Sequence, residues 1–252
     1  MFHNVGMKLL LLTAALFATG VAAPSIVVNE APAHLNQARQ LVDNLKGTSL
    51  NEYGGGKRHI DWDMHPCEAR TVCSSFTTLL LEHSYNWPAG FMKKWVGDGN
   101  PMAADYYDAI VAHNGFLQVV HVGKIEPGDI LAVRYTDHHV SRNGVEDTGH
   151  VMVVDQVVEG REDKEPLKAG LKQYFISVID SSASGHGTSD TRRIGKGQYT
   201  GGIGKGIMRI YADSDDHIAG YTWSDQKNSE FFSAPSRILV IGRLDPDRLP
   251  KP

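Results

Sequence analysis

The hydrophobic pattern of this chain changes at Gly115 from helical spacing to β-strand runs. Before that point, residues 31–46 and 70–83 carry apolar side chains three or four residues apart, which predicts two helices. A third, shorter helix is predicted over residues 105–113. Because the helices come first and the strands afterwards, the pattern predicts one α+β domain in which N-terminal helices pack on an antiparallel sheet.

The predicted strands are runs rich in β-branched residues that are bounded by turn residues. They cover residues 130–135, 150–158, 174–179, 207–211, 221–223 and 238–241. Two segments lack such runs, and we expect both to be loops: residues 47–66 and residues 181–205. The second is rich in Ser, Gly and Thr, and loops of that length are usually functional or disordered.

The N-terminus has the three parts of a secretory signal peptide. Lys8 precedes a short apolar run over residues 9–18, and small residues follow up to Ala22. The run is too short to span a bilayer, and no other stretch is long and apolar enough to do so. We therefore predict a signal peptide over residues 1–22. The mature domain of residues 23–252 would be exported to the periplasm or the extracellular space, with no integral membrane segment.

Composition excludes several classes of protein. The 252 residues carry a formal net charge of −4, so the chain lacks the basic footprint of a nucleic-acid-binding protein. A hydrophobic content of 41% excludes disorder as the main state. Two cysteines are too few for a disulfide scaffold or a cysteine-rich zinc fold. No spacing of histidine and cysteine forms a complete metal-ligand set, so we expect neither a metal nor a cofactor.

Cys73 is the candidate nucleophile. It lies near the start of the predicted helix 70–83, where the positive end of the helix dipole lowers the pKa of a thiol. A thiolate nucleophile also needs a base and a group that orients the base. His150 begins one predicted strand and Asp180 ends another, so the fold would have to bring the three together. Two alternatives remain open: a structural cysteine, or a disulfide between Cys67 and Cys73.

Several short motifs resemble those of NlpC-like papain-fold cysteine peptidases, and they occur in the same order. They are Tyr53-Gly54-Gly55, Cys73-Ser74-Ser75-Phe76, Ile125-Glu126-Pro127-Gly128-Asp129-Ile130 and Thr148-Gly149-His150-Val151. The resemblance implies a papain-like fold with Cys73 as nucleophile, His150 as base and Asp180 in the third polar position. The family usually has Asp before the cysteine, where this chain has Val72, and more often has His in the third position.

The resemblance also implies a substrate, the peptidoglycan stem peptide, in which the enzyme would hydrolyse an amide bond. Tyr53 belongs to the matched aromatic-Gly-Gly motif, and Trp223 would line the cleft. His186 and Arg192 in the loop 181–205 would pair with substrate carboxylates. Two other functions stay open: an acyltransferase that uses the same thioester intermediate, and an inactive binding or structural protein of the cell envelope.

Overall fold

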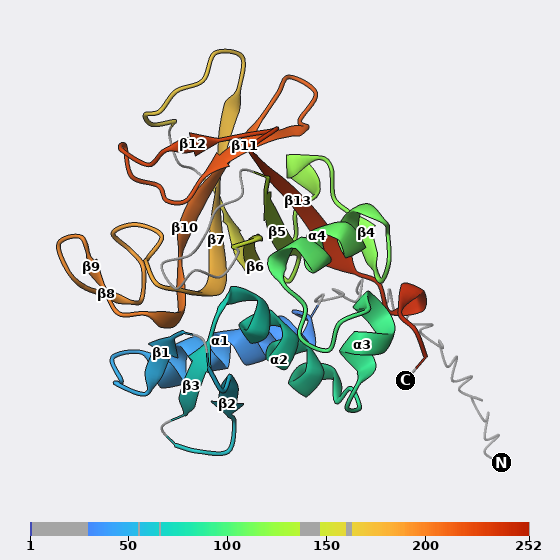
Figure 1. The fold of residues 1–252 in the computed structure, drawn as a ribbon. Coiled ribbons are helices and arrows are strands. Elements are labelled where there is room, and N and C mark those ends of the chain that lie inside the picture. The colour runs from blue at the N-terminus through green and yellow to red at the C-terminus, as the bar shows by residue number, and fades with distance from the viewer. Residues whose placement is uncertain (2–29, 55, 66, 137–146, 160–162, 252) are drawn as a thin grey trace. The chain divides into compact units, whose positions relative to one another are not determined.

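A curled, eight-stranded antiparallel sheet makes up most of the second half of the chain, in the computed structural model shown in Figure 1. Its strand order is β12-β11-β10-β7-β6-β5-β13-β4. The longest strands lie in the middle of the sheet: β6 (Gly149–Val158), β7 (Lys172–Ser182) and β10 (Gly202–Ala212). The others are β4 (Phe116–Gln118), β5 (Ile130–Tyr135), β11 (Ile218–Thr222), β12 (Phe231–Phe232) and β13 (Arg237–Leu244).

The structure describes residues 1, 30–54, 56–65, 67–136, 147–159 and 163–251. Residues 31–252 form one compact unit. The predicted signal peptide, apart from Met1, lies outside the described residues. Over the described ranges, no helix is long and apolar enough to cross a membrane.

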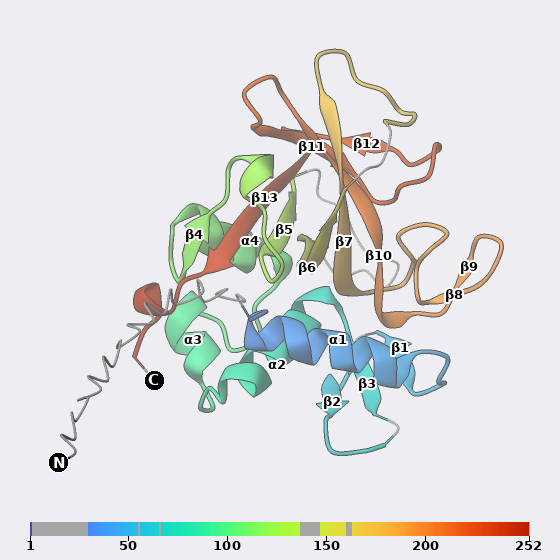
Figure 2. The same ribbon diagram turned by 180° about the vertical axis from the view of Figure 1, so that it is seen from behind.

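The helices precede the sheet in the chain, as predicted. They are α1 (Ala33–Leu45), α2 (Cys73–Tyr85), α3 (Phe91–Val96) and α4 (Ala103–Val111), followed by the 3-10 turns η1 (Val122–Lys124) and η2 (Pro246–Arg248). Figures 1 and 2 show α1 and α2 at one end of the long strands β6, β7 and β10. The six-residue helix α3 was not predicted, because one and a half turns are too short to display a helical period.

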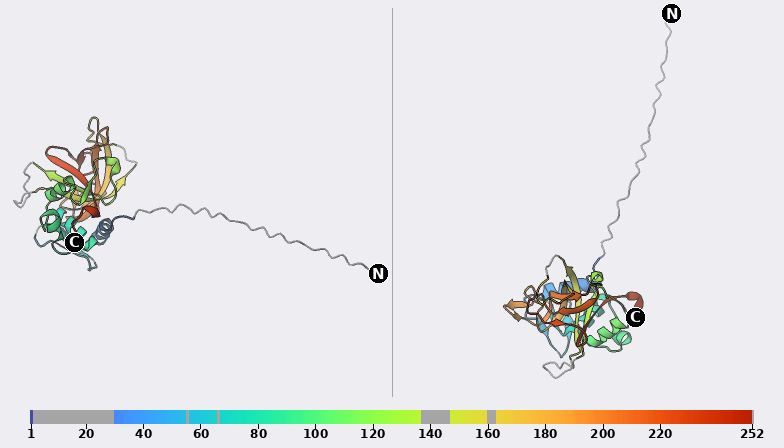
Figure 3. Two further views of the ribbon diagram at one scale, coloured as in Figure 1. Left: turned by 90° about the vertical axis from the view of Figure 1, so that its right-hand side faces the viewer. Right: turned by 90° about the horizontal axis from the view of Figure 1, so that it is seen from above.

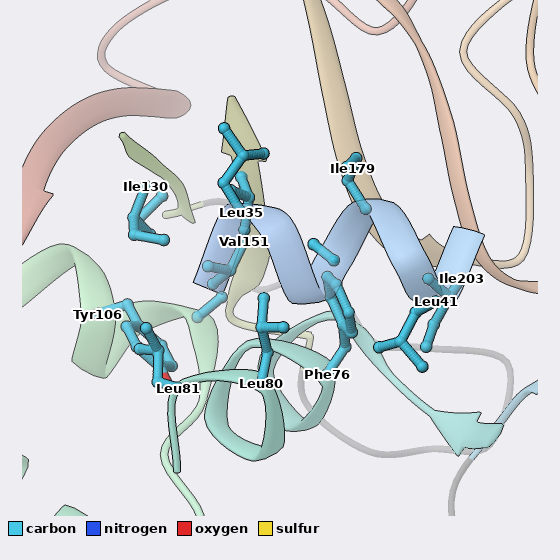
Figure 4. Close-up of a cluster of buried hydrophobic side chains, with 14 of the residues drawn as sticks. Leu35, Leu41, Phe76, Leu80, Leu81, Tyr106, Ile130, Val151, Ile179 and Ile203 are labelled. Atoms are coloured by element: carbon cyan, nitrogen blue, oxygen red, sulfur yellow. The ribbon is translucent and has the colours of Figure 1, made fainter. Parts of the chain in front are cut away.

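Two hydrophobic cores cover opposite faces of the sheet. On the helix side, Leu35 and Leu41 of α1 meet Phe76 and Leu80 of α2 and the strand residue Ile179 (Figure 4). The second core lies on the other face and consists mostly of strand residues, among them Leu131, Met152, Val178, Met208 and Tyr221. Strands β11 and β13 come into contact although four strands separate them, so the sheet is curled (Figure 3).

The two predicted loops are partly wrong. The segment 47–66 contains β1 (Asn51–Tyr53) and β2 (His59–Asp61), which pair on either side of β3 (Glu68–Thr71). The segment 181–205 contains the hairpin β8 (Arg193–Gly195) and β9 (Gln198–Tyr199) and the start of β10. Strands of two or three residues are too short to show alternation, and the glycines at the start of β10 resemble a loop.

Those glycines are required by packing. A Cβ atom at Gly204 would lie 2.5 Å from Nε of Arg192, and one at Gly206 would lie 2.5 Å from Oδ2 of Asp190. Both distances are shorter than real Cβ contacts allow. The first part of β10 therefore lacks side chains on the face that the segment containing Asp190 and Arg192 covers.

Candidate active site

Cys73 is the first residue of α2, as the sequence predicts for a nucleophile at a helix start. Val72 before it is extended, and Ser75 caps the turn: its Oγ accepts a hydrogen bond from the Val72 amide at 2.9 Å and donates one to the Val72 carbonyl at 3.1 Å. The first amide bonded within the helix is that of Phe76. The amides of the first turn thus direct their positive ends toward the thiol.

His150 and Asp180 lie on adjacent strands and on one face of the sheet. Strands β6 and β7 pair Val153 with Ile179, and continuing that register puts Asp180 two residues from the position opposite His150. Side chains two residues apart on a strand share a face. Gly149 fixes the position of His150, because a Cβ at this glycine would lie 1.8 Å from the carbonyl oxygen of Val133 on β5.

The structure brings Cys73, His150 and Asp180 together. Nε2 of His150 lies 2.6 Å from Oδ2 of Asp180, and the other side of the ring interacts with the Cys73 thiol. Burial alone lowers the pKa of His150, but the charge of the Cys73 thiolate and the hydrogen bonds to Asp180 and Cys73 outweigh it and raise the pKa to about 10. The geometry therefore favours the charged form of the His150 ring, which lies between the thiol and a carboxylate.

Asp180 is fully buried and lies among cations. Its Oδ2 also lies 2.9 Å from Nε2 of His186, and its Oδ1 lies 2.9 Å from Nη2 of Arg192. Burial raises the pKa of this carboxyl, but the charges of Arg192 and His186 and the hydrogen bonds from His150 and His186 hold it well below its usual range. Asp180 is therefore a permanent anion that holds the His150 ring by Nε2.

The structure corrects the predicted roles of His186 and Arg192. Arg192 is 2% exposed, and its guanidinium contacts Asp190, Asp180 and the carbonyl of Gly202. Both ring nitrogens of His186 are also bonded within the protein. Both side chains are buried against these partners, so neither presents a donor to a substrate carboxylate. A charged residue in a Gly/Ser-rich segment suggests exposure from sequence alone, which is why the prediction failed.

A pocket of about 190 Å³ opens beside His150. It is lined by Tyr135, His150, Ser182, Ser184, Gly185, His186 and Trp223. Trp223 lies edge-on to the His150 ring, with centroids 5.4 Å apart and planes at 86°. Sequence analysis selected Trp223 for this wall but missed the two serines, because hydroxyls in a Ser-rich segment carry no distinguishing signal.

Tyr53 lies at the end of β1 on the thiol side of the site and is 39% exposed. Desolvation and the negative charges of Cys73, Asp147 and Asp180 raise the pKa of its hydroxyl to about 12. The hydroxyl consequently stays protonated near neutral pH and can act as a hydrogen-bond donor in the electrostatic field of the thiolate.

Cys67 is not part of this arrangement. Both cysteines are free thiols, so the structure contains no Cys67–Cys73 disulfide. Cys67 is buried, and its Sγ donates to the carbonyl of Asp61 at 3.0 Å. Desolvation, together with the charges of Asp61 and Asp63, raises the pKa of this thiol. The two cysteines thus lie in different environments: that of Cys67 disfavours the thiolate, whereas Cys73 lies at a helix start beside His150.

Among the residues that the structure describes, two groups of side chains have the atom types of a metal site. His150, Asp180 and His186 form one, but Arg192 lies at the same carboxylate, and its positive charge opposes binding of a dication there. Asp213, Asp215 and His217 form the other, at an exposed hairpin turn. Asp213 Oδ1 already accepts the amides of Asp215 and His217 at 2.9 Å, so hydrogen bonds within the turn account for this group.

Comparisons with known proteins give one relative to report. The "Uncharacterized protein R653" of Acanthamoeba polyphaga mimivirus is 32% identical over 226 residues, which cover 85% of this chain and 97% of the viral protein. No protein-family model matches the sequence, and no solved structure matches it. At this identity and coverage, the chain belongs to the same family as the viral protein.

Proposed function

We propose that this member of the R653 family is a papain-like cysteine hydrolase that cleaves amide bonds. The observation that carries the proposal is the chain of contacts from the Cys73 thiol to His150 and from His150 Nε2 to Asp180 at 2.6 Å. A nucleophile, a base and a residue that orients the base are the three parts that thiol catalysis needs. The order of helices and strands and the NlpC-like motifs support the same assignment.

In the proposed reaction, Cys73 Sγ attacks the substrate carbonyl and His150 donates its proton to the leaving amine. Water then attacks the thioester, with His150 as the base, and the thiolate leaves. Asp180 fixes the imidazole in the orientation that points its other nitrogen at Sγ. The Cys73 amide at the start of α2 would stabilise the oxyanion, and the protonated Tyr53 hydroxyl is the candidate for a second donor.

The proposed substrate class is the stem peptide of peptidoglycan, reached after export by the predicted signal peptide. This part rests on the NlpC-like motifs, because Arg192 and His186 do not offer free donors to stem-peptide carboxylates. The pocket beside Trp223 would accept a small group on the leaving-amine side of the cleaved amide bond, since His150 must reach the leaving nitrogen.

The test compares two cysteine variants. Purified protein is incubated with muropeptides, and the products are identified by mass spectrometry. We expect Cys73→Ala to abolish cleavage, and Cys67→Ala to retain most of it, because the Cys67 thiol is buried and away from His150. Iodoacetamide at mildly acidic pH should alkylate Cys73 faster than Cys67.

The outcomes separate the alternatives. Equal loss in the two variants would assign a structural role to both thiols. Product joined to an added amine would identify an acyltransferase. A slowly alkylated Cys73 with no cleavage would leave the binding or structural protein as the better description.

A further inference from the structure

His186 is a buried histidine whose two ring nitrogens both face acceptors. Nδ1 lies 2.6 Å from the carbonyl oxygen of Trp223, and Nε2 lies 2.9 Å from Oδ2 of Asp180. A carbonyl oxygen and an ionised carboxylate can only accept hydrogen bonds, so both nitrogens must carry a hydrogen. The ring is 4% exposed, and no water is needed to satisfy it. The geometry therefore requires an imidazolium at His186.

From this arrangement we propose that His186 is a positioning residue: an imidazolium behind Asp180 that holds the carboxylate and limits how tightly it retains the proton of His150. The inference rests on the proposed function, because it assigns a role around the same histidine. Oδ2 of Asp180 is shared between the two rings, at 2.6 Å from His150 and 2.9 Å from His186. Hydrogen bonds that share one acceptor oxygen compete for it.

The charge balance of the site agrees with this role. Asp180 and Asp190 supply two negative charges, and Arg192 and His186 supply two positive ones. Together they form a buried group with no net charge. The Cys73–His150 ion pair can therefore form, and be neutralised by proton transfer, without an excess charge beside it. With a neutral side chain at 186, one carboxylate charge would remain uncompensated, and it would hold the proton on His150 more strongly.

The local structure is built to hold this imidazolium. The His186 amide donates to Oδ2 of Asp190 at 2.7 Å, and the same carboxylate accepts from the Arg192 guanidinium. Gly206 on β10 leaves the required space, since a Cβ there would lie 2.8 Å from Cβ of His186. Backbone, carboxylate and glycine thus fix the ring without using its nitrogens.

Charged or titratable groups approach the two histidines from every surrounding element. At the histidines and at Asp180 between them these are Cys73 on α2, Asp180 on β7, and Asp190 and Arg192 after β7. Asp147 and Arg58 act on Tyr53 on the thiol side, and Asp225 lies beside Gly187. Of the cations, Arg58 acts on Tyr53, and Arg192 lies at Oδ1 of Asp180 rather than at the oxygen that His150 uses. Among the described residues, His186 is therefore the cation placed to compete directly with His150.

The first experiment needs no substrate. The full chain is labelled with ¹⁵N-histidine, and the His186 signals are assigned by their loss in His186→Gln. We expect both ring nitrogens of the folded protein at the chemical shifts of protonated nitrogen at neutral pH, because each faces an acceptor. A bare nitrogen at neutral pH would overturn the proposal, whether or not the protein is an active hydrolase.

The second experiment measures the role. His186→Gln removes the charge but retains a donor, so the thiolate should still attack while the more basic His150 becomes a weaker acid. We expect kcat/KM to fall at least about 10-fold on an amide substrate, where the leaving amine needs the proton. On an ester with a good leaving group, we expect a change below about 3-fold. The ring centroids of His150 and His186 are 6.5 Å apart. At that distance, loss of the His186 charge should move the alkaline limb of the pH profile of kcat/KM up by about one to two pH units.

The exposed His121 gives the matched control, and His121→Gln should leave both rates unchanged. If His186→Gln lowers kcat/KM equally on the amide and the ester and leaves the alkaline limb of the pH profile in place, His186 only supports the fold. An unchanged kcat/KM on the amide would also overturn the proposal. If the wild-type protein cleaves neither substrate, the proposed function fails, and the ¹⁵N shifts still decide the charge of His186.

Discussion

Replacing His150 by glutamine should change the pH dependence of folding stability in a predictable way. The folded protein raises the pKa of His150 from 6.5 to about 10. A group whose pKa is higher in the folded state contributes stability that is complete below its unfolded pKa and is lost as the pH rises through the folded pKa. At about 1.36 kcal/mol for each pKa unit, the full contribution is about 4–5 kcal/mol below pH 6.5 and close to zero above pH 10.

Urea unfolding of wild type and His150→Gln at several pH values measures this contribution. The difference between the two free energies of unfolding should shrink by about 3 kcal/mol between pH 6 and pH 9. Taking the difference removes the titration of the groups that do not interact with His150, which both proteins share. In a Cys73→Ser background, the same difference should vary less with pH, because the thiolate that raises the pKa is absent. A difference that stays constant across this pH range would refute the thiolate–imidazolium pair.

Three further changes test the surroundings of the site. Asp180→Asn removes the carboxylate that His186 contacts and one of the two that Arg192 contacts, and thermal unfolding should show a loss of about 3–5 kcal/mol. Gly206→Ala puts a Cβ 2.5 Å from Oδ2 of Asp190, so we expect about 1–3 kcal/mol of destabilisation and slower thiol alkylation. Gly123→Ala, with open space around it, should show neither effect. Phe76→Ala empties a fully buried site and should cost about 3–5 kcal/mol in urea unfolding. A cost below 1 kcal/mol would contradict the packing in Figure 4.

The α+β class and the central strands could be predicted because their patterns are long. Helix α2 spans Cys73–Tyr85 against a predicted 70–83, and β6 spans Gly149–Val158 against a predicted 150–158. The short strands β1, β2, β8 and β9 were missed because two or three residues contain no usable period. Element length, more than residue type, therefore separated the correct predictions from the missed ones.

The three central site residues were also selected from sequence, whereas their supporting shell was not. Cys73 and His150 are marked by their places at the start of a helix and of a strand. His186 and Arg192 were selected but given the wrong role, because sequence shows neither burial nor the partner that neutralises a charge. A better signal lies at the start of β10, where the glycines Gly204 and Gly206 alternate. Glycine at alternate strand positions indicates that another part of the chain packs closely on that face.

A buried pair of hydroxyls joins β3 to β7. Thr71 Oγ1 donates to Ser181 Oγ at 2.9 Å, and Ser181 Oγ donates to the Thr71 carbonyl at 3.1 Å, across 110 residues of sequence. Thr71 comes two residues before Cys73, and Ser181 directly follows Asp180. Contacts between residues so far apart in sequence form late in folding, because closing a long loop costs entropy first. We expect the nascent chain to carry a thiol of ordinary reactivity until the sheet closes, and the reactive thiolate to arise only in the finished fold.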